Sequence, residues 1–147
     1  MYHDNFDRSR QDKIEQISDF VKRTGKQIKL RVCWESPGGS NCCECEKCSI
    51  TMIALMLENL DPKKFGFYFN DDIYKYSKKC LLEGKWDFIH DDIDLWKDIK
   101  KHVSDSDERE FFKWLKSYDL NKSIGKYNTF YNKIRRKTLA TYKKIKA

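Results

Sequence analysis

The sequence predicts a mainly α fold, a helical domain with one short strand that leads into a cysteine-rich loop. Three observations support this prediction. Apolar residues recur at intervals of three and four through several segments, with capping residues and glycines between them. Apolar and polar residues alternate over residues 27–32, as in a half-buried strand. Five of the six cysteines lie within residues 33–48.

The first predicted helix covers residues 9–24. Ile14, Ile17 and Val21 share one face, and Gly25 follows as a stop signal. The alternating segment 27–32 comes next and leads directly to the first cysteine of the loop. A single strand leaves backbone donors and acceptors unpaired, so we expect it to pair with another chain or with another part of a larger protein.

The cysteine loop contains the strongest turn signal of the sequence, Ser-Pro-Gly-Gly-Ser-Asn at residues 36–41. A helix is predicted from residue 46 or 47 to residue 60. It is apolar on nearly every side, which is typical of a helix in the middle of a core. Asp61-Pro62 ends it, since a residue before proline disfavours the α conformation.

The second half of the chain is predicted to be helical after an aromatic segment, residues 65–69, that is a short strand or an extended link. Acidic residues and turn residues mark the helix starts. The expected helices run from residue 72 to about 83, from residue 91 or 92 to about 103, from the turn at 104–107 to about 118, and from a break near 121–125 onward.

Charge is distributed unevenly along the 147 residues, which carry a formal net charge of +7. Residues 121–147 contain nine Lys and Arg and no acid, so the rest has 21 basic and 23 acidic side chains. The basic last helix, which includes Lys133, Arg135, Arg136 and Lys137, suits nucleic acid, acidic lipid or an acidic protein surface. A solvated helix face is the simpler interpretation and the favoured one.

No stretch has the ~18–20 apolar residues of a membrane span. The first twenty residues lack the apolar core of a secretory signal. We therefore expect a cytoplasmic protein, in which closely spaced cysteines are metal ligands more often than disulfides.

Four cysteines form the principal candidate site: Cys33, Cys42, Cys45 and Cys48, in a C-x8-C-x2-C-x2-C array. Zn²⁺ takes four thiolates in a tetrahedron, and a complete set of protein ligands defines a structural site with no position for an activated water. The fold prediction is thus a helical domain with one short strand leading into a four-cysteine zinc loop. Cys43 is the expected spare, and Cys80 is expected to be a buried free thiol.

Other interpretations of the array stay open at this point. An iron–sulfur cluster also uses spaced thiolates, and a C-x-x-C pair can be a redox centre. Free structural thiols are a further alternative. No catalytic motif is found: His3, His90 and His102 are scattered, and the acids near residues 91–94 fit a helix start better than a metal site.

The cysteine array resembles the C-terminal zinc site of 7-cyano-7-deazaguanine synthase and related PP-loop ATPases of the adenine nucleotide alpha hydrolase-like superfamily. In that family a cysteine at a strand end precedes a glycine-rich loop, a C-G-x-C-x-x-C run and a helix. Cys43 stands here at the glycine position of that run. Residues 7–14 are similar to the family's segment before the zinc strand. Asn41 and Thr51 agree with relatives associated with bacterial polysaccharide gene clusters.

The resemblance covers residues 7–60 and implies two parts. Residues 1–60 would be the C-terminal remnant of a PP-loop ATPase-like domain with its zinc loop at 33–48, and residues 61–147 a helical extension with a basic C-terminal helix. The family binds ATP through an S-G-G-x-D-S loop that this sequence lacks. The chain alone would then not be catalytic, and ATP would bind only through a missing N-terminal domain or subunit of an ATP-dependent ligase or synthase. The alternative is a free-standing four-cysteine zinc module that binds nucleic acid or a protein partner through the basic tail.

Overall fold

The computed structural model describes residues 8–36, 38–86, 92–124, 126, 133 and 134. This part of the chain is mainly helical, as predicted, and contains no strand. Its elements are α1 (Arg10–Thr24), α2 (Glu46–Leu57), the 3-10 helix η1 (Pro62–Phe65), α3 (Ile73–Glu83), α4 (Asp92–His102) and α5 (Glu110–Ser117).

Local capping signals fix most helix ends where they were predicted. Ser9 and Asp12 form a capping box at the start of α1, and Gly25 ends that helix in the left-handed conformation. The Asp72 side chain accepts hydrogen bonds from the first amides of α3, and Gly84 ends it in the same left-handed way. These bounds depend on neighbours in the sequence, which is why the sequence predicts them well.

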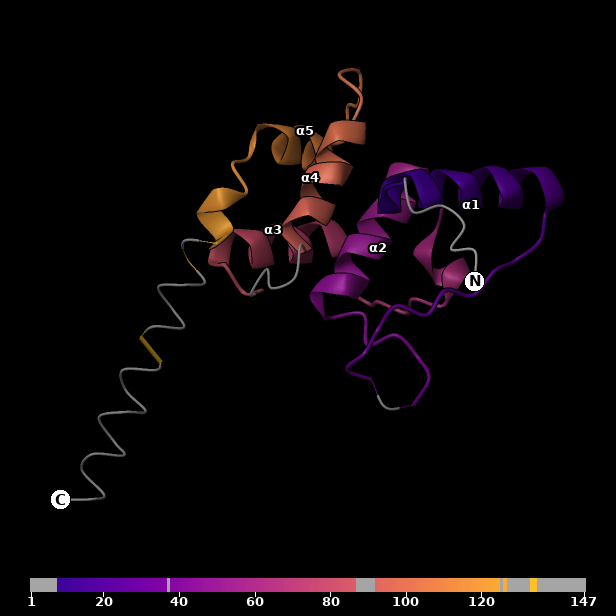
Figure 1. Cartoon of the computed structure of the whole chain (residues 1–147), viewed down its shortest axis with the longest axis horizontal. Coiled ribbons are helices and arrows are strands. Elements are labelled where there is room, and N and C mark those ends of the chain that lie inside the picture. The colour runs from indigo at the N-terminus through magenta and orange to yellow at the C-terminus, as the bar shows by residue number, and fades with distance from the viewer. Residues whose placement is uncertain (1–7, 37, 87–91, 125, 127–132, 135–147) are drawn as a thin grey trace.

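Helix α2 lies at the centre of the fold and packs against α1, α3 and α4 (Figure 1). All its residues from Cys48 to Leu55 are buried, which confirms its predicted place in the core. A contiguous apolar core joins it to the later helices, and its largest fully buried side chains include Ile50, Ile53, Leu55, Phe67, Leu81, Trp96, Ile99, Phe112 and Leu115.

The start of α5 is tied to the end of α2 by Arg109. Its Nη1 donates to the carbonyl of Met56 at 2.5 Å and its Nη2 to the carbonyl of Leu57 at 3.3 Å. A guanidinium at a helix C-terminus satisfies carbonyls that lack intrahelical partners and opposes the helix dipole. Segments on both sides of residue 60 therefore share one packed interior.

The prediction of a strand over residues 27–32 is wrong, because this segment joins no β-ladder. The Leu30 amide donates to the carbonyl of Phe65 at 3.0 Å, but the Val32 amide donates to the Asn41 side chain instead of to a neighbouring strand. Residues 65–69 likewise form no strand: Phe65 ends η1, and residues 67–69 are irregular. The Asn41 side chain makes hydrogen bonds to this segment that a second strand would otherwise make.

Helix α2 ends at Leu57, three residues before the predicted end. Asn59 adopts a left-handed φ of 59°, and the Leu60 amide donates back to the carbonyl of Leu55 at 2.9 Å, which closes the helix. Residues 121–124 are helical at the predicted break. Nearly all of the basic C-terminal helix lies outside the described residues, so that prediction stays a prediction. Within the described part, no helix has the length and apolar character that crossing a membrane requires.

Candidate metal centre

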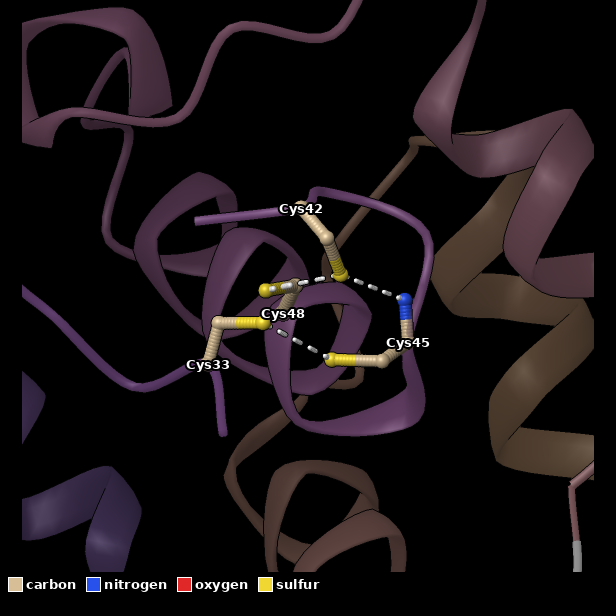
Figure 2. A group of neighbouring side chains, drawn as sticks. All are labelled: Cys33, Cys42, Cys45 and Cys48. Atoms are coloured by element: carbon tan, nitrogen blue, oxygen red, sulfur yellow. Dashed lines mark hydrogen bonds between the residues drawn. The ribbon is translucent and has the colours of Figure 1, made fainter. Parts of the chain in front are cut away.

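The four cysteines of the array come from three positions in the chain. Cys33 ends the extended segment that follows α1, Cys42 and Cys45 lie in the loop, and Cys48 lies in the first turn of α2. Cys45 occupies the N-cap of α2 but its side chain caps no amide. Its sulfur is directed instead toward the other cysteines (Figure 2).

The four sulfur atoms converge to within 4.8 Å of one another. The Sγ atoms of Cys42 and Cys48 are 3.9 Å apart, as are those of Cys33 and Cys45 (Figure 2). A Zn–S bond of about 2.3 Å in a tetrahedron places sulfurs about 3.8 Å apart. Both the donor set and its spacing therefore fit a single four-coordinate metal ion, and Cys33, Cys42, Cys45 and Cys48 could bind one.

Backbone amides support the sulfurs. The amide of Cys45 donates to Sγ of Cys42 at 3.3 Å. Burial by itself raises the pKa of the Cys33 thiol, but hydrogen bonding with the backbone of Cys42, Ser36 and Glu35 outweighs it and lowers that pKa to about 6. Such amide–sulfur contacts stabilise a thiolate, which is the form that binds metal.

The pKa values of the thiols nearer α2 are raised instead of lowered. Burial raises the pKa of Cys45 to about 11, and burial together with the neighbouring Cys45 and Cys42 sulfurs raises the pKa of Cys48 as well. Four close thiolates repel one another unless a cation lies between them. Because ligands must be deprotonated, binding of a divalent ion at this site would release protons.

Asn41 holds the segments of the site together, a role that its position in the sequence does not predict. Its Oδ1 accepts from the amides of Val32 at 3.0 Å and Cys33 at 3.3 Å. Its Nδ2 donates to the carbonyls of Leu30 at 2.8 Å and Gly66 at 3.2 Å. One amide side chain thus joins the incoming segment, the loop and the residue after η1. An asparagine directly before a metal-ligand turn was the available signal, but its partners are distant in sequence.

Cys43 lies outside the four-sulfur group, as predicted. Its backbone has a left-handed φ of 63°, a conformation that favours glycine, and its buried thiol donates to the carbonyl of Asn41 at 3.6 Å. Burial raises the pKa of this thiol. Cys80 is buried on α3, away from the site, which agrees with its predicted role as a free thiol.

The remaining candidates do not join the centre. His102 lies between α4 and α1, where its Nε2 is 3.2 Å from Oδ1 of Asp12. Asp94 pairs with Lys97 on its own helix. His3 and His90 lie outside the described residues. Among the described residues, the four cysteines form the one cluster of three or more potential ligand side chains close enough to hold a metal ion.

No family model, curated protein or solved structure gave a significant match to this chain. The metal centre is therefore supported by its own geometry and chemistry, without help from a relative.

Proposed function

We propose that this chain is a zinc-binding helical domain in which Cys33, Cys42, Cys45 and Cys48 hold one structural Zn²⁺. The observation that carries the proposal is the convergence of four sulfurs to within 4.8 Å. Four protein ligands leave no open coordination position for water or substrate. The ion would stabilise the loop and the start of α2 and would take no part in a reaction.

Zinc is preferred to an iron–sulfur cluster because of the sulfur spacing. A cluster places an inorganic core among its cysteine ligands, so the ligand sulfurs must stand farther apart than they do around one ion. A single iron ion in the same four sulfurs is the remaining competitor. Elemental analysis of the protein purified without added metal is expected to give one zinc per chain. A stoichiometric amount of iron, with visible absorbance, would contradict the zinc assignment.

We further propose that this domain works beside a nucleotide-binding domain of the PP-loop ATPase type, supplied by another segment or subunit. The resemblance over residues 7–60 is the basis of this proposal. One structural feature supports it. Lys29 and Arg31 flank Leu30, whose amide donates to the carbonyl of Phe65. Among the described residues, the backbone groups of Lys29 and Arg31 themselves make no hydrogen bond. This free edge could accept a strand from a partner by β-augmentation.

A gene that encodes an S-G-G-x-D-S loop, adjacent to this one or in frame with it, would support the second proposal. Co-expression with that product is expected to give a stable complex that binds ATP. If the two proteins do not associate, the proposal of a PP-loop partner fails. The zinc proposal is unaffected by that result, because it is tested by metal content alone.

A further inference from the structure

Trp34 stands in solvent beside the candidate metal centre. It exposes 85% of its surface, whereas Trp86 and Trp96 are buried. Burying an indole side chain is strongly favourable, so a tryptophan kept in water at a defined position calls for an explanation. The zinc loop that carries it projects from the start of α2, away from the other helices (Figure 1).

One face of the indole is covered by a cation. The Nζ of Lys47 lies 4.5 Å from the centroid of the Trp34 ring. Lys47 stands between Cys45 and Cys48, and Trp34 directly follows Cys33. Both partners are therefore attached to ligands of the same centre, which would hold the ring and the ammonium in a fixed relation. The exposed fraction of Trp34 leaves its other face accessible.

Exposed basic side chains outnumber exposed acidic ones on the loop and on the two segments that the Leu30–Phe65 hydrogen bond joins. The guanidinium of Arg31 lies on the loop, where its Nη2 donates to the carbonyl of Ser36 at 3.0 Å. The hydrogen bond between Leu30 and Phe65 brings a second basic segment beside the first. The exposed basic residues of these two segments are Lys26, Lys29, Arg31, Lys63 and Lys64. The exposed acids of the loop and of these two segments are Glu35, Glu44 and Asp61.

We propose that Trp34, Lys47 and Arg31 form a binding surface for single-stranded nucleic acid. An unpaired base would stack on the open face of Trp34, and Arg31 and the neighbouring lysines would contact the phosphates. Stacking on an aromatic ring combined with a basic track is the usual way in which proteins hold single strands. An apolar protein surface would satisfy the ring but would leave the cations unpaired. This surface includes no residue of the basic segment 121–147 and does not depend on a PP-loop partner.

The test uses the full zinc-loaded chain and fluorescein-labelled U12 and dT12 oligonucleotides over a series of salt concentrations. Trp34→Ala is expected to weaken binding by roughly 5- to 150-fold, the range for loss of one stacked base. The dependence on salt should not change, because stacking releases no counterion. Trp34→Phe should retain most of the affinity.

Charge variants separate the ionic contacts from stacking. Arg31→Ala is expected to reduce the slope of log K against log salt by about 0.7, the value for one phosphate contact in a single strand. Lys75→Ala is the matched control, since Lys75 is an exposed lysine on α3 and is expected to leave both affinity and slope nearly unchanged. Saturating U12 should also protect the wild-type tryptophan fluorescence from iodide quenching, because Trp34 is the most exposed described tryptophan.

Two results would overturn the proposal: no binding of either oligonucleotide at low salt, or equal binding by the wild type and Trp34→Ala. Zinc content is measured in each variant. Trp34→Ala is expected to keep its zinc, so failure of the nucleic-acid proposal can be told apart from failure of the metal proposal.

Discussion

The cysteine loop and the helical core are stabilised in different ways. In the loop, Cys33 and Cys43 are the buried residues among those described between 33 and 45, and the backbone is irregular. In the core, helices α2 to α5 bury large side chains completely, among them Ile53, Leu55, Leu81, Trp96, Phe112 and Leu115. The loop therefore has little apolar area to bury, whereas the core gains most of its stability from burial.

This difference indicates that a short irregular loop beside a well-packed core depends on bonds of its own. The loop has the hydrogen bonds of Asn41 and the four convergent sulfurs. The two regions meet at the first turn of α2, where Cys48 is fully buried and the Glu46 carboxylate accepts from Nε1 of Trp96 at 3.2 Å. Variants in each region should separate the two sources of stability.

The largest effect is expected from loss of a ligand. Cys48→Ser should abolish stoichiometric metal binding. The binding free energy that is lost is at most about 10–16 kcal/mol, the range for structural zinc. Amide exchange should rise at residues 30–33 and 42–48 more than in α5. Cys80→Ser is the control, because Cys80 is equally buried but remote from the centre. Loss of metal from the control would show that folding in general, and not this ligand, holds the ion.

The converse variant weakens the core and leaves the loop intact. Phe112→Ala removes a fully buried ring that packs against Tyr74 and Phe111. It is expected to lower the free energy of unfolding by about 3–5 kcal/mol. Below its melting temperature the variant should still bind one metal ion, as measured by elemental analysis. If metal affinity fell together with stability, the two regions would be one cooperative unit.

Asn41 tests the hydrogen bonds of the loop. Asn41→Ala removes four contacts to backbone groups and is expected to cost about 2–6 kcal/mol at ~0.5–1.5 kcal/mol per bond. Metal affinity, measured by competition with a chelator, should fall about 10- to 100-fold, as for other residues that orient ligands. Asn41→Asp keeps the acceptor but loses the donor, so its affinity should lie between those of the wild type and Asn41→Ala.

Cys43 tests the backbone of the ligand turn. Its left-handed φ of 63° costs a non-glycine residue about 1–2 kcal/mol, so Cys43→Gly should be neutral or stabilising by up to about 1 kcal/mol after loss of the buried thiol. Cys43→Val should destabilise, because a β-branched side chain tolerates this conformation least. The denaturant midpoints of the two variants, compared with that of the wild type, measure these changes in stability. A destabilised glycine variant with reduced metal content would make the Cys43 thiol part of the centre.

The smallest effect concerns pH and the contact between α1 and α4. Burial lowers the pKa of His102, but hydrogen bonding with Asp98 and attraction to Asp98, Asp12 and Glu15 outweigh it and raise that pKa above 6.5. The stabilisation by protonated His102 is then complete below about pH 6.5 and is lost as the pH rises through the higher folded pKa. His102→Gln should abolish this dependence in melting curves measured from pH 5 to 8. An unchanged pH profile would show that His102 does not titrate in this range.

Most of the fold could be predicted because the start and end of a helix depend on residues that are neighbours in the sequence. The capping box at Ser9, the aspartate before α3 and the glycines after α1 and α3 act through neighbouring residues. The strand was predicted wrongly for a related reason. Alternation over residues 27–32 indicates that the segment prefers an extended conformation. It does not show what the segment hydrogen-bonds to, which in the structure is the Asn41 side chain.

By itself the sequence determined the helical class, the central helix α2 and the four candidate ligands, since cysteine spacing and helical periodicity are properties of short segments. Only the tertiary structure decided that four sulfurs converge, that the Cys43 thiol donates to the carbonyl of Asn41 outside this group, and that Arg109 joins α5 to the end of α2. It also placed Lys47 over an exposed Trp34. Each of these depends on contacts between residues distant in sequence or on a turn's exact path, which local preferences do not specify.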